Sequence, residues 1–269
     1  MQKQQLITTS QASLVNTRDR GLNYGDGFFT TAKIVDAKVE LWPLHRARLV
    51  ECAKRLAFPE INFIELEAAI SAYIANEKCA VLKVLITRGE GGRGYGLPDQ
   101  PQLNIVLSLS AYPSHYDELK LTGLSLAVSP IKLAAQPLFA GLKTLNRLEQ
   151  VMIKHAMQSQ QCDDVLVLDH QNHVIETSAA NVFAIKAGRI FTPQLNECGI
   201  KGVYLQSLCA KLPVEFVQMT VEQLKTMDAV FVCNSLMAAI PVAAIDNVKF
   251  EIKTSLSVLN GLTAKEFTC

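Results

Sequence analysis

Apolar and polar positions divide the chain into short runs that alternate between strand-like and helix-like patterns. Residues 28–35 are rich in β-branched and aromatic side chains and predict a strand, with a turn at 36–37 and a returning strand over 39–42. Apolar, β-rich runs at 79–87 and 103–109 predict two more strands. The first part of the chain is therefore expected to be built around strands.

Two helices are predicted between these strands. Pro43 suits the first turn of a helix, where its missing N–H is not needed, and this helix is expected to reach about Ala57. Asn62 followed by Glu65 resembles a capping box, which would open a second helix ending near Asn76. The later segment RGEGGRGYGLPDQP has five glycines and two prolines, so it is expected to be an irregular loop.

The rest of the chain also mixes strands and helices, after a polar, proline-containing stretch that is the expected linker. Strands are predicted over 124–128, 165–168, 174–176, 182–185, 189–191, 214–217 and 229–232. Helices are predicted over 144–159, over 203–211, between 217 and 229, and at the end of the chain. The sequence thus predicts a mixed α/β protein with a smaller N-terminal domain over 1–112, a linker over 113–120 and a larger C-terminal domain over 121–269.

Composition and charge limit the kinds of ligand. The 269 residues are 49% hydrophobic and 19% charged, which excludes intrinsic disorder. Lysine and arginine number 26 against 25 for aspartate and glutamate, so no charge excess points to nucleic acid or to an anionic membrane. The apolar run over 236–245 is about half the ~20 residues that a membrane helix needs. A small-molecule ligand is therefore expected.

The cysteines and histidines give no pattern of a disulfide framework or a metal site. The seven cysteines are odd in number and form no CxxC pair, which is typical of a reducing compartment. The first ten residues have no apolar stretch behind Lys3, so no secretory signal is expected and the protein is predicted to be cytoplasmic. His170 and His173 lie in a turn-like HQNH segment, which favours a solvated loop over metal binding.

Three segments carry possible chemistry, and each also has a plain structural interpretation. Lys143 precedes an amphipathic helix, where it is either a surface lysine or a desolvated amine able to form a Schiff base. Glu176 ends an apolar strand, where it is either solvated or a carboxylate that holds a cofactor ring nitrogen protonated. Gly199 and Gly202 either make a simple turn or allow helix-terminal amides to cradle a phosphate.

In this order the segments resemble a known family. The stretches NYGDGFFTTAKI, HRARL, TRGEGGRGY, GLKTLNRLEQ, ETSAANVF, GIKGV and FVCNSLMAAIPV are similar to those of the fold-type IV pyridoxal-phosphate enzymes. That family contains branched-chain and D-amino-acid aminotransferases and 4-amino-4-deoxychorismate lyases. The resemblance covers nearly the whole chain and is closest to the lyase branch in GDGFFTTA, RGEGGRGY and KTLNRLEQV.

The resemblance implies a set of residues that bind pyridoxal 5'-phosphate. It implies that Lys143 forms the Schiff base and that Glu176 pairs with the pyridinium nitrogen, which keeps the ring able to accept electrons. It implies that Arg48 binds the phosphate through its planar guanidinium, whereas Arg46 is expected at the surface. The other cofactor ligands that it implies are the backbone amides of Val203 and Tyr204, the hydroxyl of Ser235 and the neighbouring Asn234.

Substrate contacts are implied at four positions. Arg93 and Tyr95 stand where D-amino-acid aminotransferases contact the substrate carboxylate, and an arginine suits a substrate with two carboxylates. Thr30 replaces a glutamate common in the aminotransferases, and it is either a catalytic hydroxyl or a packing residue. Asn181 either contacts the substrate or has a structural role. Departures at Thr30 and Ala238 favour lyase chemistry over transamination.

The resemblance implies the architecture and activity of the whole protein. It implies two α/β domains with the cofactor at their interface, as in D-amino-acid aminotransferases. It implies cleavage of 4-amino-4-deoxychorismate to 4-aminobenzoate and pyruvate in folate biosynthesis. A D-amino-acid or branched-chain aminotransferase is the alternative, and a non-catalytic relative would have lost Lys143 or Glu176. A homodimer is implied, with Arg93 or Tyr95 able to act across it, and transient contact with aminodeoxychorismate synthase is conceivable.

Overall fold

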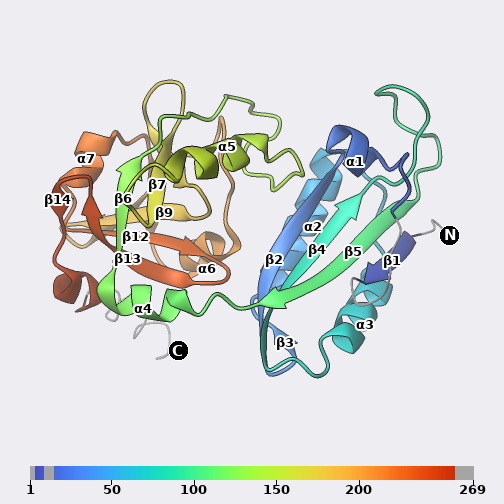
Figure 1. The fold of residues 1–269 in the computed structure, drawn as a ribbon, viewed down its shortest axis with the longest axis horizontal. Helices are drawn as coiled ribbons and strands as arrows, with labels where there is room; N and C mark the ends of the chain where they lie inside the picture. The colour runs from blue at the N-terminus through green and yellow to red at the C-terminus, as the bar shows by residue number, and fades with distance from the viewer. Residues whose placement is uncertain (1–3, 9–14, 258–269) are drawn as a thin grey trace. The chain divides into compact units, whose positions relative to one another are not determined.

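The computed structural model describes residues 4–8 and 15–257 and divides into two compact units (Figure 1). The first unit comprises residues 1–112 and 142–147, and the second comprises residues 113–141 and 148–269. Residues 142–147 therefore belong to the N-terminal unit, although the sequence assigned them to the C-terminal part. The segment 113–120, expected as a linker, contains most of helix α4 (His115–Thr122).

The first unit is a five-stranded sheet with three helices. The strand order is β1 (Gln4–Thr8), β5 (Leu103–Ala111), β4 (Cys79–Thr87), β2 (Gly27–Val35) and β3 (Lys38–Val39). The helices are α1 (Arg20–Tyr24), α2 (Trp42–Arg55) and α3 (Phe63–Tyr73). All neighbouring strands are antiparallel except β1 and β5, which run parallel.

Alternation along β2 separates two faces of this sheet. Phe28, Thr30, Ala32 and Ile34 are buried, and Phe28 and Ile34 join the core with residues of α2 and α3. The intervening residues Phe29, Thr31 and Lys33 are only half-buried. Because successive side chains of a strand point to opposite faces, the second set lies on the face away from this core.

The second unit is built on a nine-stranded sheet. Its strands are β6 (Leu124–Val128), β7 (Asp164–Leu168), β8 (Val174–Thr177), β9 (Asn181–Lys186), β10 (Arg189–Pro193), β11 (Val214–Val217), β12 (Ala229–Asn234), β13 (Ala238–Ile245) and β14 (Val248–Lys249). Besides α4, its helices before residue 252 are α5 (Leu148–Met157), α6 (Val203–Lys211) and α7 (Val221–Lys225). The path β9–β12–β13–β6–β7–β8 returns to β9 through the pair Glu176 and Asn181, so six strands close into a ring.

Most predicted elements are confirmed, with two instructive differences. The expected capping residue of α3 is confirmed, since Asn62 accepts a hydrogen bond from the Glu65 amide. The helix predicted from 144 begins only at Leu148, because residues 143–145 pair with β2 instead. The apolar run over 236–245 contains strand β13, which the sequence analysis did not assign. Residues 252–257 are helical, and the rest of the expected final helix lies outside the described residues.

Candidate functional site

Lys143 is fixed at the edge of the first unit's sheet. Its carbonyl accepts a hydrogen bond from the Phe29 amide at 3.0 Å, and the Leu145 amide donates to the Gly27 carbonyl at 2.9 Å. These bonds make residues 143–145 a short continuation of the sheet beside β2. The Lys143 ammonium lies 4.7 Å from the centre of the Phe29 ring, on the face of β2 away from the core. The lysine is half-buried rather than fully solvated.

Helix α2 carries a buried arginine and contacts the backbone of this lysine. Arg48 is 9% exposed, and burial lowers the pKa of its guanidinium to about 10, so it stays charged at neutral pH. One turn later, burial raises the pKa of the Cys52 thiol, and a hydrogen bond from the Lys143 backbone opposes that rise. Cys52 therefore contacts the backbone of Lys143 from a position one turn beyond Arg48 on α2.

Thr30 lies on the core side of β2, beneath α2, and not on the Phe29 face. Its hydroxyl is fully buried and is hydrogen-bonded to Nδ1 of His45 at 2.6 Å, on the core side of β2. The Phe29 ring that contacts Lys143 is on the opposite face of the strand. This placement does not fit the expected contact between Thr30 and a substrate, and it assigns the residue to the core beneath α2.

His45 is itself a buried, uncharged group. Burial, together with the positive charge of Arg48, lowers the pKa of His45 to about 3. Among the described residues its Nε2 has no hydrogen-bond partner. The unfolded chain, with the ordinary pKa of 6.5, therefore binds a proton that the folded chain excludes between about pH 6.5 and pH 3.

This exclusion predicts a specific acid sensitivity. As pH falls below about 6.5, we expect the free energy of unfolding to decrease by about 1.4 kcal/mol per pH unit from His45 alone. His45→Gln should flatten that dependence, whereas the exposed-residue control His155→Gln should keep it. Trp42 is the only tryptophan and opens α2, so urea unfolding followed by its fluorescence at pH 7, 5 and 4 reports on this unit. Parallel pH profiles for wild type and His45→Gln would contradict the prediction.

The sheet face that carries the Phe29 ring also carries two residues, one on β2 and one on β4, that the sequence analysis missed. The Lys83 ammonium lies 4.6 Å from the centre of the Phe29 ring, so two lysines share one aromatic side chain. Thr31 is directly opposite Lys83 in the β2–β4 register and shares that face with Phe29. The period-2 alternation of β2 could have separated Thr31 from Thr30 once one buried neighbour was known. The pairing with Lys83 needed the sheet register.

In the second unit, Glu176 and Asn181 form the strand pair that closes the ring. Both are buried, with 5% and 4% of their surface exposed. Oε2 of Glu176 accepts a hydrogen bond from the Ile200 amide at 2.9 Å. Asn181 donates to the Ile200 carbonyl at 2.7 Å and accepts from the Gly202 amide at 2.8 Å. The two side chains therefore hold the same short loop from adjacent positions.

That loop leads directly into helix α6. Gly202 is the N-cap of α6, and Val203 and Tyr204 are its first residues. The first amides of a helix have no carbonyl partner within the helix, and the helix dipole favours an anion there. A Cβ at Gly202 would collide with Oδ1 of Asn181, which explains the glycine. The arrangement places a buried carboxylate and an anion-binding helix end on one loop.

The turn between β12 and β13 adjoins this arrangement. Oδ1 of Asn234 accepts hydrogen bonds from the amides of Leu236 and Met237 at 2.8 and 3.0 Å, and its Nδ2 donates to the Ala179 carbonyl at 3.2 Å. Asn234 therefore shapes its own turn and joins it to the turn between Glu176 and Asn181. Ser235 lies in the same turn and is half-buried.

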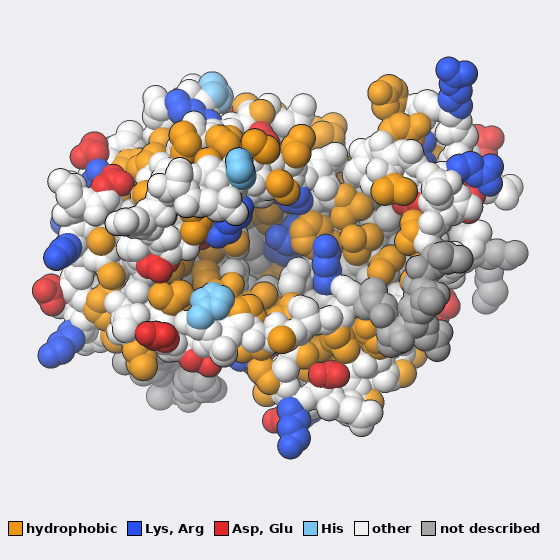
Figure 2. Space-filling view, viewed as in Figure 1, with side chains coloured by type: hydrophobic (Ala, Val, Ile, Leu, Met, Phe, Trp, Pro, Cys, Tyr) orange, Lys and Arg blue, Asp and Glu red, His pale blue; other side chains and the backbone are white. Residues whose placement is uncertain are grey.

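Arg93 and Tyr95 lie on the glycine-rich loop between β4 and β5. Both are exposed, Tyr95 by 84%. In Figure 2, basic and hydrophobic side chains stand out on this loop at the upper right. Arg46 is a surface residue as expected, half-exposed and 3.4 Å from Glu67.

The remaining chemical groups define no other site. Among the described residues, no three His, Cys, Asp or Glu side chains gather in a way that could hold a metal ion. His173 pairs with Asp169 at 3.3 Å within its turn. Within residues 4–8 and 15–257, no helix is both long and apolar enough to cross a bilayer.

A family model described as amino-transferase class IV matches residues 27–245, which span both units and every candidate residue. The chain therefore belongs to the class IV aminotransferase family. Within it, the chain is 37% identical to an aminodeoxychorismate lyase of Vibrio harveyi over 236 residues, 84% of this chain and 86% of the relative. The family resemblance predicted from the sequence is confirmed.

Solved structures agree with this assignment. A 4-amino-4-deoxychorismate lyase from Pseudomonas aeruginosa superposes with a TM-score of 0.86 at 33% identity, covering 93% of this chain and 96% of its own. A hypothetical aminotransferase from Mycobacterium tuberculosis, in its PLP-bound form, gives a TM-score of 0.77 at 18% identity, covering 94% of each chain. The second match shows the fold alone. The predicted mixed α/β, fold-type IV class is confirmed.

Proposed function

We propose that the chain is a pyridoxal-phosphate-dependent lyase that converts 4-amino-4-deoxychorismate to 4-aminobenzoate and pyruvate, a step of folate biosynthesis. The observation that carries the proposal is the 37% identity to an aminodeoxychorismate lyase across 84% of the chain. The geometry supports the cofactor class, since a lysine, a buried arginine, a buried carboxylate and a helix N-terminus are what such a cofactor requires.

The donor set fits pyridoxal 5'-phosphate. A buried carboxylate such as Glu176, held by the Ile200 amide, suits a protonated ring nitrogen. The N-terminus of α6 and the buried guanidinium of Arg48 suit a phosphate. Ser235 supplies a hydroxyl from the turn that Asn234 shapes. We assign Lys143 as the amine that condenses with the cofactor aldehyde.

When bound, pyridoxal phosphate supplies an electron sink for the charge that develops on the carbon next to the substrate nitrogen. The neutral amine of Lys143 would take the proton from that ring carbon. Loss of this proton and breakage of the bond to the enolpyruvyl oxygen make the ring aromatic. The leaving group gains a proton and becomes pyruvate, so no oxidant or reductant is needed.

The proposed substrate has two carboxylates, so we expect cationic side chains to bind it, and the first unit supplies two candidates. Lys83 shares the Phe29 ring with Lys143, and Arg93 stands on the exposed loop between β4 and β5. We infer that these two side chains, with Tyr95, bind the carboxylates. A hydroxyl at the reacting atoms is better supplied by Thr31 than by Thr30, because Thr31 lies on the Phe29 face of β2.

An aminotransferase acting on D- or branched-chain amino acids is the competing function, since the family includes such enzymes. The two functions differ in what amino acids alone do to the loaded protein. An aminotransferase converts its cofactor from the aldehyde form to the amine form when it is given a good amino-acid donor. It releases one oxo acid per active site in doing so. We expect D-alanine and L-leucine to produce this spectral change far more slowly than aminodeoxychorismate is consumed, and a faster change would favour the aminotransferase.

Asn181 allows the phosphate site to be tested separately. Asn181→Ala removes both hydrogen bonds that hold residues 200–202, so we expect affinity for pyridoxal phosphate to fall about tenfold. Affinity for pyridoxal, which lacks the phosphate, should change much less. Asn247→Ala removes an exposed asparagine from another turn and serves as the control. Equal losses for both ligands, measured by titration at matched thermal stability, would contradict this role.

We further propose a cytoplasmic homodimer. Exposure of Arg93 and Tyr95 is compatible with their acting on a partner's site, as the family resemblance implies. Transient contact with aminodeoxychorismate synthase would deliver an unstable substrate directly. The seven cysteines, odd in number, are typical of a reducing compartment and support the cytoplasmic assignment.

A further inference from the structure

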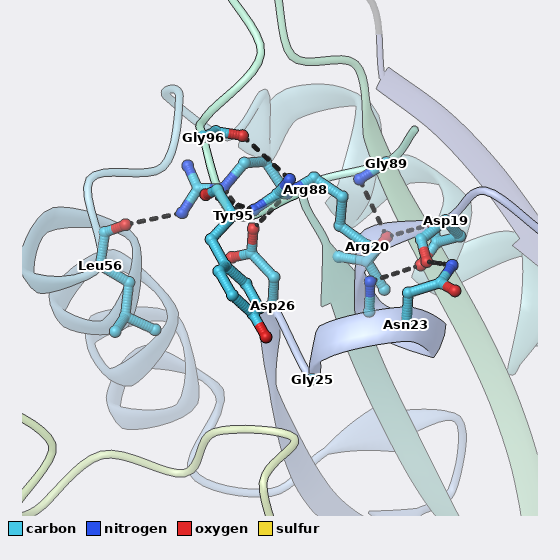
Figure 3. A network of polar contacts seen from close by, with 12 residues as sticks. Asp19, Arg20, Asn23, Gly25, Asp26, Leu56, Arg88, Gly89, Tyr95 and Gly96 are labelled. Carbon is cyan, nitrogen blue, oxygen red and sulfur yellow. Dashed lines mark hydrogen bonds and ion pairs between the residues drawn. The ribbon is translucent and has the colours of Figure 1, made fainter. Parts of the chain in front are cut away.

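The loop that carries Arg93 and Tyr95 is held from inside by one buried side chain. Arg20 opens helix α1 and is only 3% exposed. Its Nη1 donates to the carbonyls of Gly94 and Gly96 at 3.3 and 3.0 Å, and its Nη2 donates to the carbonyl of Tyr95 at 3.1 Å (Figure 3). A single guanidinium therefore forms hydrogen bonds with three consecutive backbone carbonyls.

These backbone hydrogen bonds determine which groups of the loop face solvent. Because Arg20 binds the backbone, the Tyr95 side chain remains 84% exposed and Arg93 is also exposed. Gly94 has φ +86°, a left-handed conformation that a glycine adopts without strain. The Tyr95 ring packs edge-on against Tyr24 at 5.4 Å, and the Arg20 guanidinium lies 5.0 Å from that Tyr24 ring.

Arg20 is itself fixed by a charged network. Its Nε donates to Oδ2 of Asp26 at 2.7 Å, and the same oxygen accepts from Nε of Arg88 at 2.8 Å (Figure 3). Arg88 in turn donates to the carbonyls of Leu56 and Ala57 at 2.8 and 2.7 Å. Those carbonyls end α2, the helix that carries Arg48. The loop is thus connected, through Asp26, to the helix of the proposed phosphate arginine.

The base of the loop is tied to the same segment. The Arg20 amide donates to the Gly89 carbonyl at 2.8 Å. The preceding residue, Asp19, is 1% exposed; its carboxylate caps α1 and accepts from Thr87 and Asn104 at 2.7 Å each. Both the base and the tip of the loop are therefore anchored by residues 19 and 20.

We propose that Arg20 is a positioning residue that sets the affinity for the substrate's carboxylates by fixing the loop with Arg93 and Tyr95, without touching the substrate. The inference rests on the proposed function, which assigns carboxylate binding to Arg93. Only a planar fork with several N–H donors satisfies Asp26 and three carbonyls together. A lysine keeps the charge but has a single nitrogen, so it cannot make these contacts at once.

The kinetic test compares Arg20→Lys, Arg20→Met and the control Arg18→Met with wild type. Arg18 is an exposed arginine two residues away that pairs with Glu90 at the loop base. We expect Arg20→Lys to raise KM about tenfold with kcat within about threefold of wild type. Arg18→Met should leave both constants unchanged, and the visible absorption of bound cofactor should be the same in all variants. If Arg20→Met does not fold, the comparison of Arg20→Lys with wild type is enough to test the proposal.

A double-mutant cycle separates positioning from general destabilisation. If Arg20 acts through Arg93, adding Arg20→Lys to Arg93→Met should raise KM by less than about twofold further. Additive effects of the two substitutions would overturn the proposal. So would an unchanged KM in Arg20→Lys while wild type turns over substrate normally.

A second readout does not depend on activity. Trypsin cleaves after an exposed arginine, and cleavage after Arg93 reports how often the loop leaves its anchored state. We expect Arg20→Lys to speed this cleavage at least about fivefold, with Arg18→Met at the wild-type rate. Unchanged cleavage would overturn the anchoring role. Absence of 4-aminobenzoate formation by wild type would instead count against the proposed function, whatever the cleavage rates.

Discussion

Replacing Lys143 with alanine is expected to abolish turnover and to remove the visible absorption that marks a lysine condensed with the cofactor aldehyde. We assign this residue two roles, holding the cofactor and moving the substrate proton, and its backbone is fixed to β2 by the hydrogen bond from the Phe29 amide. Among the described residues, Lys83 is the other lysine at the Phe29 ring. We expect kcat to fall by about 10³-fold or more.

Lys83→Met is the matched control for this experiment. Both ammonium groups lie within 4.7 Å of the Phe29 ring centre, so both sample the same surroundings. Lys83→Met should retain the visible absorption and should raise KM rather than remove turnover. Visible absorption that survives Lys143→Ala and disappears in Lys83→Met would show that the assignment of the two lysines is reversed.

Glu176→Gln is expected to lower kcat by about 10²-fold while the cofactor still binds. Glutamine keeps an oxygen that can accept the Ile200 amide hydrogen bond, so the loop before α6 should keep its position. What it removes is the negative charge that holds the ring nitrogen protonated, and with it much of the electron-accepting capacity. Turnover and cofactor affinity should therefore separate.

Measuring both quantities on one preparation makes the Glu176 prediction decisive. Cofactor affinity by titration should change by less than about threefold, and urea unfolding should follow wild type, since the hydrogen bond is kept. Glu197→Gln, which alters an acidic residue in the segment leading to the same loop, is a control for charge alone. A Glu176→Gln enzyme with wild-type kcat would remove this residue from the mechanism.

Local signals explain why much of the fold was predictable. Pro43 and Asn62 mark the starts of α2 and α3, because both act within a few residues of themselves. The alternating run over 28–35 predicted strand β2 in the same way. The cofactor candidates were found because their motifs keep short, fixed spacings, as in the GIKGV segment before α6.

Long-range pairing explains the errors. The helix expected from 144 starts late because residues 143–145 pair with β2, more than a hundred positions earlier in the chain. Thr30 and Thr31 are adjacent in sequence, and only the packing of His45 against β2 shows which hydroxyl is buried. Asn181 was expected either to contact the substrate or to have a structural role, and its hydrogen bonds to residues 200–202, which no local pattern reveals, fit the structural role.

The most direct test of the central claim is the product balance of the reaction itself. Purified protein with pyridoxal phosphate should be supplied with freshly made aminodeoxychorismate, and 4-aminobenzoate and pyruvate should be followed together. The account predicts equal amounts of both products, formed only with wild-type protein and not with Lys143→Ala. A cofactor-loaded protein that forms neither product, yet transfers amino groups from D-alanine or L-leucine to an oxo acid, would contradict it.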